Sequence, residues 1–477
     1  MKRTLFYIII CSSFISCVPT VHYNPDTKNE YKGSGEPESS TYIYPFNDES
    51  QNNISEITIE SNKVINPDSV NIGIPPLKYN KEWLCLLTLD DCVHSAYSYT
   101  WAAINDRPQT TKYFYDVQHL IAGDLPPDTF SYHKTLGSTD GAGNEVRFAF
   151  TVALYQENKN LNDLPYIEKG FTNNYFRFYM KSTLIWSDIK DMLNYGEGIA
   201  FHDASTNAVN NEDSLIKHFY IGEDSVQKHL SGRGCKMLAE PDGNIHYINA
   251  AIKFPGMQTM TAQGDANYTL YPFKVNTDLE KAVIARDFYN TPYDIEYAVV
   301  KNLLSFNKEY RPAICIGSHR TYNDMSELLL WLNNKYGKDG DDTMWFPSQE
   351  EYFEYCYYRA HAEITKSIDG KTLKITVSMP SNTYFYYPSI TVNVSGMKKE
   401  DVKSITSSDN VTGLSYANYN NELMLNINCR KHLLDLAQHY MSVYLANKTE
   451  YTYLDAKYFV NMLKPSTDKD ALLEQLK

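Results

Sequence analysis

Short apolar runs alternate with segments of helical pattern between about residues 76 and 360. Trp83 to Leu89 is a nearly continuous apolar run, which is typical of a strand buried on both faces. Strands that alternate with helices indicate an α/β domain with a parallel sheet. Other runs that read as buried strands are Gly198 to Phe201 and Ala313 to Ile316, and the helical patterns cover 184–195, 326–336 and 349–361.

The pattern changes after about residue 361, where apolar and polar positions alternate with a period of two. Turn residues such as Asp369-Gly370 separate the alternating segments. This period and these turns predict antiparallel strands with one buried face. We therefore expect a small all-β sandwich over 361–464, followed by a polar tail at 465–477. The alternating segments are Thr372 to Met379, Ser389 to Ser395 and Leu423 to Asn428.

The N-terminal segment has the pattern of an export signal. Two basic residues precede Leu5 to Ile10, an apolar stretch too short to span a bilayer but suited to a secretory signal. The segment ends in Phe14-Ile15-Ser16-Cys17, which resembles the cleavage box of bacterial lipoproteins. That resemblance implies a signal peptide over 1–17, a lipid on Cys17, and attachment to a membrane of the bacterial cell envelope, periplasmic or on the outer surface. The alternative is an ordinary signal peptide with an incidental cysteine.

Composition bears on the class of binding partner and on the order of the N-terminal region. Lys and Arg number 44 and Asp and Glu number 58, so the net charge is −14, which argues against nucleic acid as a partner. Residues 18–75 are rich in Asn, Ser, Pro and acidic residues, which predicts a flexible linker.

Of the 8 cysteines, Cys11 and Cys17 lie in the N-terminal segment, and the rest contain no Cys-x-x-Cys pair. Buried free thiols are therefore expected.

Aromatic side chains are numerous, with 40 Tyr among them. Flat rings can stack on sugar faces when they are exposed, but periodic aromatics also build cores. The helical set within 352–358 is predicted to be core. For Tyr384-Phe385-Tyr386-Tyr387 both interpretations remain open.

Two adjacent carboxylates follow the first predicted strand, in Thr88-Leu89-Asp90-Asp91. Such a pair is costly directly after a buried strand unless something uses it. In α/β sheets and barrels this strand end is where ligands bind. One carboxylate can hold a metal while the other faces a bound water. The alternative is an Asp pair that only opens a loop and caps the next helix.

This strand with its Thr-x-Asp-Asp ending resembles the first motif of the polysaccharide deacetylases, the NodB-homology domain of carbohydrate esterase family 4. Other stretches follow in the family's order. Gly196 to His202 resembles the second motif, in which a strand delivers a metal-binding His. Glu240-Pro241-Asp242-Gly243 resembles the third motif, and Ile314 to His319 resembles the fifth. The resemblance covers 76–360 and implies a distorted (β/α) barrel of the deacetylase type, followed by the all-β sandwich.

The resemblance also implies a mechanism. Asp91 and His202 would hold a divalent metal, with zinc as the expected ion, and the metal would activate a water. Asp90 would be the general base and His319 the general acid. Pro241-Asp242-Gly243 would contact the substrate. The implied activity is metal-dependent hydrolysis of acetyl groups, as amides or esters, from a carbohydrate.

Several positions depart from the family's pattern. Thr206 stands where a second metal-binding His is expected, Ala239 where the third motif has Arg, and Cys92 where the first motif has Gly. The fourth motif, Asp-x-x-x-Trp, is absent from its expected place. A second function therefore stays open, in which a catalytically degenerate deacetylase-like lipoprotein binds a glycan or another partner.

Overall fold

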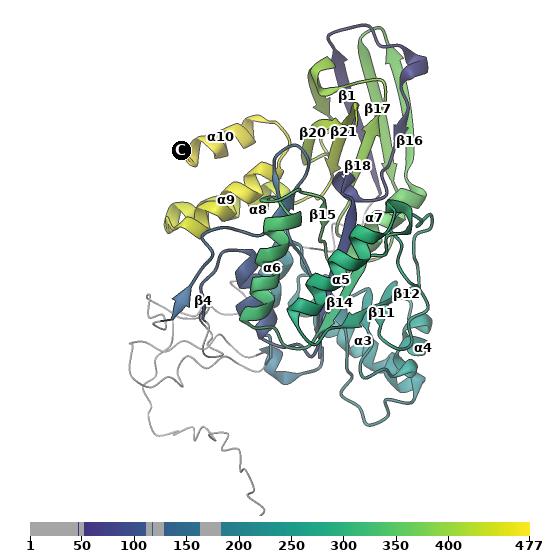
Figure 1. Ribbon diagram of the computed structural model, residues 1–477, viewed down its shortest axis with the longest axis vertical. Coiled ribbons are helices and arrows are strands. Elements are labelled where there is room, and N and C mark those ends of the chain that lie inside the picture. The colour runs from purple at the N-terminus through teal and green to yellow at the C-terminus, as the bar shows by residue number, and fades with distance from the viewer. Residues whose placement is uncertain (1–45, 47–51, 111–116, 118–127, 163–182) are drawn as a thin grey trace, which may run out of the picture.

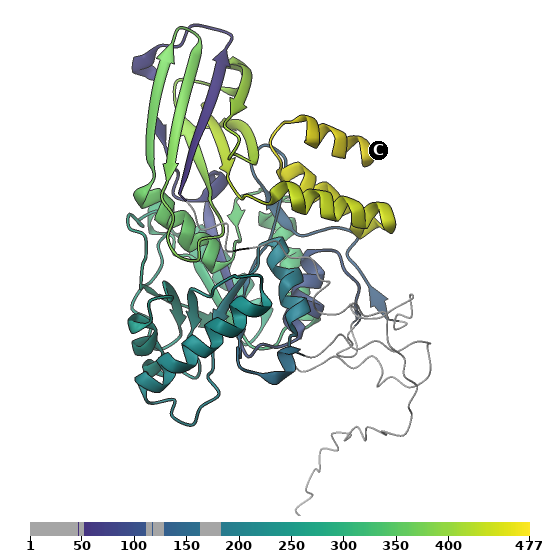
Figure 2. The same cartoon turned by 180° about the vertical axis from the view of Figure 1, so that it is seen from behind.

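The computed structural model describes residues 46, 52–110, 117, 128–162 and 183–477. The predicted signal peptide, Cys17 and most of the predicted linker lie outside these residues. Within them, no helix combines the length and the apolar character needed to cross a membrane. An antiparallel β region lies at one end of the long axis and an α/β barrel at the other (Figures 1 and 2).

Parallel strands form a nearly closed barrel, which confirms the predicted (β/α) barrel. The strand order is β12-β11-β10-β9-β8-β3-β14-β13. The two ends of this path, β12 (Val283–Ala285) and β13 (Asp287–Phe288), are consecutive in the chain and are separated only by Arg286. The short strand β15 (Met344–Trp345) pairs with the start of β3. The remaining strands are β3 (Trp83–Leu89), β8 (Thr151–Leu154), β9 (Gly198–Phe201), β10 (Met237–Ala239), β11 (Thr259–Ala262) and β14 (Ile314–Ser318).

The barrel strands match the sequence pattern closely. Every residue of β3 and of β9 is buried, as expected for strands covered on both faces. Helices follow the strands, and each predicted helical segment is present. Polar caps fix several starts; for example, the Ser348 side chain accepts a hydrogen bond from the Glu351 N–H at the start of α7. The helices are α1 (Ala102–Ile104), α2 (Trp186–Tyr195), α3 (Glu212–His229), α4 (Ile245–Lys253), α5 (Pro292–Ser305), α6 (Asn323–Tyr336) and α7 (Gln349–His361).

Two antiparallel four-stranded sheets make up the β region, ordered β16-β17-β1-β19 and β2-β18-β21-β20. Buried residues of both sheets, such as Ile375 and Val392, belong to one hydrophobic cluster. The strands are β2 (Ile72–Gly73), β16 (Glu363–Asp369), β17 (Thr372–Met379), β18 (Ser389–Val394), β19 (Val402–Ser407), β20 (Gly413–Tyr419) and β21 (Glu422–Asn428). The short pairs outside these sheets are β4 (Gln109–Thr110) with β5 (Thr129–Phe130), and β6 (Gly137–Thr139) with β7 (Glu145–Arg147).

The predicted linker at 18–75 is wrong over the residues that the structure describes. Asn53–Ser61 forms strand β1, which lies between β17 and β19. Its register with β17 runs from Asn53 opposite Met379 to Glu60 opposite Thr372. The average composition is polar, but Ile57 and Ile59 alternate with polar residues and are fully buried. Period two, rather than mean polarity, decides the structure here.

The chain after β21 is helical, which corrects both the sandwich boundary at 464 and the polar tail at 465–477. The elements are α8 (Leu433–Ala446), α9 (Glu450–Met462) and α10 (Thr467–Gln475). In α8 the buried residues recur at helical spacing, and in α10 the Ser466 side chain caps the start while Leu472 is buried. The polar composition of 465–477 concealed the helix, because Leu472 is the one buried residue of α10.

A buried charge cluster attaches α9 to the barrel side of the molecule. Asp455 on α9 forms ion pairs with Arg107 and with Arg147, whose Nη1 lies 2.6 Å from Asp455 Oδ1. The Tyr195 hydroxyl donates a third hydrogen bond to this carboxylate at 3.0 Å. The C-terminal helices are therefore part of the folded body.

All the cysteines in the described residues are free, as predicted. Cys315 is partly buried, and the others are fully buried. Those are Cys85, Cys92, Cys235, Cys356 and Cys429.

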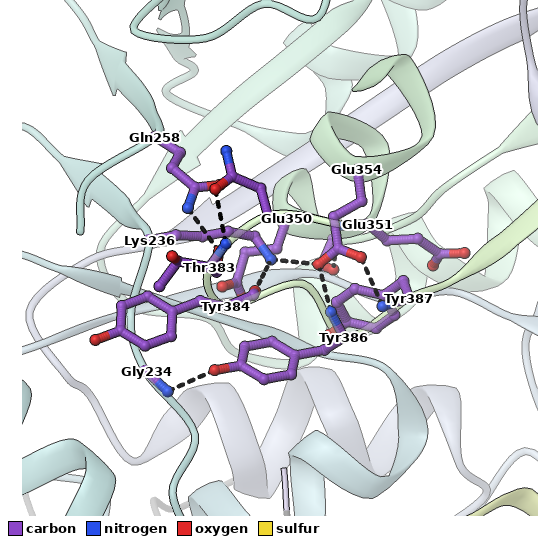
Figure 3. A network of polar contacts seen from close by, with 12 residues as sticks. Gly234, Lys236, Gln258, Glu350, Glu351, Glu354, Thr383, Tyr384, Tyr386 and Tyr387 are labelled. Carbon is purple, nitrogen blue, oxygen red and sulfur yellow. Dashed lines mark hydrogen bonds and ion pairs between the residues drawn. The ribbon is translucent and has the colours of Figure 1, made fainter. Parts of the chain in front are cut away.

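Helix α7 crosses the barrel at the N-terminal ends of its strands and is held there by two buried ion pairs. Arg233 Nη2 lies 2.6 Å from Glu350 Oε2, and Lys236 pairs with Glu354; all of these side chains are fully buried. Glu354 also accepts hydrogen bonds from the backbone N–H groups of Tyr386 and Tyr387 (Figure 3). The aromatic segment left open by the sequence is therefore mainly core.

We predict that Glu350→Gln lowers the free energy of unfolding by about 3–5 kcal/mol, because Arg233 would stay buried without its ion pair. Urea unfolding followed by circular dichroism would measure it. The matched control is Glu474→Gln at the exposed Lys477–Glu474 pair, where little change is expected. An unchanged urea midpoint for Glu350→Gln would show that the pair does not hold α7. The double variant Arg233→Met/Glu350→Leu should recover most of the loss.

Candidate active site

Residues from the carboxyl ends of three barrel strands meet at one face of the barrel. Asp90 and Asp91 follow β3, and His202 follows β9. His202 Nε2 lies 3.6 Å from Asp91 Oδ1 and 4.0 Å from Asp90 Oδ2. The Asp90 N–H donates to the Ser318 carbonyl at 2.8 Å, so the strand that delivers His319 ends beside Asp90. The structure thus brings the predicted residues to one place.

Asp90 has an arginine partner that the sequence did not reveal. Arg286 Nη1 lies 2.6 Å from Asp90 Oδ1, and Arg286 Nη2 donates to the Glu240 carbonyl at 3.0 Å. Both Asp90 and Arg286 are buried. The expected Arg position holds Ala239 instead, so the partner comes from the break between β12 and β13. The available signal was an Arg directly after the apolar run Val283–Ala285.

His202 is oriented by backbone and ring contacts. Its Nδ1 lies 2.8 Å from the Ala239 carbonyl, so Nδ1 carries a proton and donates it to that oxygen, and Nε2 faces the carboxylates. The Tyr155 ring stacks on the imidazole at 5.7 Å, and its hydroxyl donates to Asp91 Oδ1 at 2.6 Å. Tyr155 was missed by the sequence analysis, although it follows β8 as directly as His202 follows β9.

His319 lies on the exposed rim of this face. Its ring packs on Phe288 with centroids 5.0 Å apart. A Cβ at position 317 would lie 2.5 Å from the Phe288 ring, so Gly317 allows this close packing. The charge of His319 contributes to lowering the pKa of Asp91, so the two side chains belong to one electrostatic site.

A family model described as "Putative polysaccharide deacetylase" matches residues 55–477. The chain belongs to this polysaccharide deacetylase family. That description names a hydrolase that acts on carbohydrate. No curated protein matches the chain. The matched range starts within β1 and includes α8, α9 and α10, so the β region and the C-terminal helices belong to the deacetylase match together with the barrel.

Asp91 and His202 on this face influence each other's pKa. The hydrogen bond with His202, helped by that of the Tyr155 hydroxyl, lowers the pKa of Asp91 to about 2 against the opposing effect of burial. Burial alone would lower the pKa of His202, but the hydrogen bond with Asp91 and the charge of Asp90 outweigh it and raise that pKa. In the protein without a metal, the pair is therefore an ion pair at mildly acidic pH.

The metal ligands expected from the family are incomplete. Thr206 does not replace the missing His as a ligand in this arrangement, because its Oγ1 accepts the Ala208 N–H at 3.1 Å. Asp203 is engaged with the Tyr247 hydroxyl at 2.5 Å. No group of three or more His, Cys, Asp or Glu in the described residues could hold a metal ion. Catalytic zinc usually has three protein ligands, so Asp91 and His202 fit a metal only as two ligands of a shell completed by water.

Two residues of the site have left-handed backbone. Asp91 has φ 64° and Cys92 has φ 50°. This explains why the family's first motif carries Gly at the position of Cys92, since glycine adopts this conformation without strain. Here Cys92 is buried, and its N–H donates to the Ala153 carbonyl at 2.9 Å. Strained backbone of this kind clusters at active sites.

The predicted substrate loop lies at the same end of the barrel, between β10 and α4. Pro241 is buried, whereas Asp242 and Gly243 are exposed. The Glu240 carbonyl directly before this loop accepts a hydrogen bond from Arg286 Nη2, so the loop begins beside the Asp90–Arg286 pair. Its role in substrate binding stays a prediction.

We predict that Asp91→Asn lowers the pKa of His202, because its hydrogen-bonded counter-ion is lost. Histidine-ring NMR on metal-free protein would give both titration midpoints. Since the pKa of His202 is raised in the fold, its stabilising effect is complete below about pH 6.5 and is lost as the pH rises through the folded pKa. Asp91 behaves in the opposite sense and loses its contribution as the pH falls towards about 2.

The matched control for this titration is Asp242→Asn, which removes a carboxylate from the rim of the same face. It should move the His202 midpoint much less than Asp91→Asn does. Equal midpoints for wild type and Asp91→Asn would contradict the ion pair.

Proposed function

We propose that this protein removes acetyl groups from a carbohydrate by hydrolysis at the Asp90–Asp91–His202–His319 face. The observation that carries the proposal is the buried Asp90–Arg286 pair beside the Asp91–His202 pair. Two carboxylates with different partners can take different roles. Asp90 is buried and paired with the Arg286 guanidinium, whereas the Asp91 side chain is 38% exposed.

Asp90 acts as the general base. Arg286 occupies its Oδ1, which leaves Oδ2 turned towards His202 at 4.0 Å. A water between these groups can give its proton to Asp90 Oδ2 as its oxygen attacks the acetyl carbon. Arg286 then balances the charge around Asp90 and keeps the carboxylate oriented.

His319 acts as the general acid. It is exposed on the rim, where the sugar would have to sit, and its ring is fixed against Phe288. In its protonated form it gives a proton to the departing amine or alcohol, so the bond between the acetyl carbon and the sugar breaks without releasing a strong base.

Asp91 and His202 are proposed to hold a divalent metal, with zinc as the first candidate ion. When bound, such an ion polarises the acetyl carbonyl and lowers the pKa of a bound water. The lowered pKa of Asp91 and the orientation of His202 by Ala239 support this assignment. Tyr155 stacks on one ligand and donates to the other, so it positions both.

We predict that Asp90→Asn lowers the rate of acetate release from acetylated glycans by about 10²–10⁴-fold, because the base is lost. A coupled acetate assay over N- and O-acetylated oligosaccharides would measure it. Asp468→Asn on α10 is the matched control and should keep the wild-type rate. If wild type releases no acetate, or if Asp90→Asn releases it at the wild-type rate, the assignment of Asp90 is wrong.

We predict weak one-to-one zinc binding in calorimetric titration of the full chain, because the protein supplies two ligands. Asp91→Ala should abolish this binding, and Thr206→His should strengthen it by restoring an imidazole at the family's position. Asp242→Ala is the control on the same face. Unchanged zinc affinity in Asp91→Ala would contradict the metal site.

A degenerate, glycan-binding barrel is the second candidate function. The two-ligand donor set and the engaged Thr206 favour it. Glycan-array binding by a protein that releases no acetate would establish this alternative. Binding accompanied by acetate release would reject it.

We also propose that a lipid on Cys17 tethers the protein in the bacterial cell envelope, on the periplasmic side or on the outer surface. The support is the sequence of residues 1–17. Metabolic labelling with a fatty acid tests this, since Cys17→Ala should lose the label. A labelled Cys17→Ala variant would reject the assignment.

A further inference from the structure

A cavity lies at the other end of the barrel from Asp90 and His202. Its lining includes Ala149 and Gly196, which stand just before β8 and β9, so it opens at the N-terminal ends of the parallel strands. It also includes residues of β20, β21 and α9, which meet beside the barrel (Figure 1). Its empty volume is about 830 Å³, part of it open to solvent. Ligand sites commonly lie where domains meet.

Hydrogen-bonding groups without a protein partner line this cavity. The hydroxyls of Tyr79 and Tyr458 form no hydrogen bond within the described residues, and neither do the side-chain amide nitrogens of Asn428 and Asn461. Burial raises the pKa of both phenols, and the charge of Arg430, which also lines the cavity, lowers it less strongly. Both tyrosines are therefore neutral donors at physiological pH.

The charges around the cavity balance. Its charged lining residues are three cations, Lys78, Arg147 and Arg430, and three anions, Asp140, Glu145 and Glu351. Lys78 Nζ pairs with Glu351 Oε1 at 2.7 Å. Asp140 accepts hydrogen bonds from Ser415 and Asn144. With charges of both signs paired in this way, the cavity has no excess charge to select an ion.

The rings supply a complementary apolar surface. Tyr79, Tyr195, Tyr387 and Tyr458 all line the cavity. Lys78 lies 5.1 Å from the centroid of the Tyr79 ring, and the Arg147 guanidinium lies 4.4 Å from that of Tyr458, so cation–π contacts help to hold both rings. Parts of these rings lie next to amides and hydroxyls in the cavity lining. A sugar ring has the matching chemistry, since it has C–H faces and a rim of hydroxyl groups.

We propose that this cavity binds a neutral carbohydrate unit, at a site separate from the face that carries Asp90 and His202. The C–H faces of the sugar pack on the tyrosine rings. Its hydroxyls exchange hydrogen bonds with Tyr79, Tyr458, Asn428 and Asn461. Because β20, β21, α7 and α9 all contribute to the wall, the bound sugar also stabilises the junction between the β region and the barrel.

The test is calorimetric titration of full-length Asp90→Asn protein with cellobiose, maltose and N,N′-diacetylchitobiose as probes. The Asp90→Asn background keeps hydrolysis out of the readout, and it makes the result independent of the proposed activity. At least one probe should bind with saturation below about 10 mM, which is a free energy of only a few kcal/mol. Tyr458→Phe and Tyr79→Phe each remove one hydroxyl and should weaken binding about tenfold.

Tyr310→Phe is the matched control, because Tyr310 is an exposed tyrosine on the chain outside the cavity; it should leave binding unchanged. Melting temperatures of all variants without sugar should agree, which separates lost binding from lost folding. Saturable binding that Tyr458→Phe and Tyr79→Phe leave unchanged would overturn the proposal. Absence of binding by every probe would overturn it as well.

Discussion

Two buried ion pairs, Arg233–Glu350 and Lys236–Glu354, are the interactions on which the arrangement of the molecule depends. Buried charges are costly, so each carboxylate must stay with its partner. Glu350 Oε2 also accepts the Ile199 N–H at 2.9 Å, which ties α7 to β9. Lys236 directly precedes β10, which ties α7 to the next strand. One helix therefore fixes the starts of the two strands whose ends supply His202 and Ala239.

The same helix connects the barrel with the β region. The carboxylate of Glu354 accepts two backbone N–H groups from the segment that leads into β18. On the barrel side, Gln349 Nε2 donates to the Met260 carbonyl of β11 at 3.1 Å. Helix α7 thus contacts both the N-terminal ends of the barrel strands and the β region. Displacement of α7 would disturb both ends of the barrel, because short strands transmit a shift along their length.

The sequence predicted the elements whose apolar pattern is clear, either as an unbroken apolar run or as a regular helical spacing. Trp83–Leu89 and Gly198–Phe201 have the predicted bounds because every residue of each strand is buried, and Gln349–His361 also has its predicted bounds. The site residues Asp90, Asp91 and His202 were also found, since they follow buried strands directly. Arg286 was missed because it acts from a strand break across the barrel. Only the spatial closure of the ring, where β12 pairs with β11 and β13 pairs with β14, brings it to Asp90.

Strand β1 has a consequence for the order in which the chain can fold. It is one of the two inner strands of a sheet whose other members, β16, β17 and β19, all come after the barrel in the chain. The sheet cannot close before the entire barrel sequence is available, and such distant pairings are slow to form. Until then β1 is an unpaired strand with exposed edges, a state prone to aggregation. A fragment that begins at residue 76 would lack this strand and leave β17 and β19 without their common neighbour. The β region therefore cannot fold independently of the chain that forms the barrel, although the two look like separate domains.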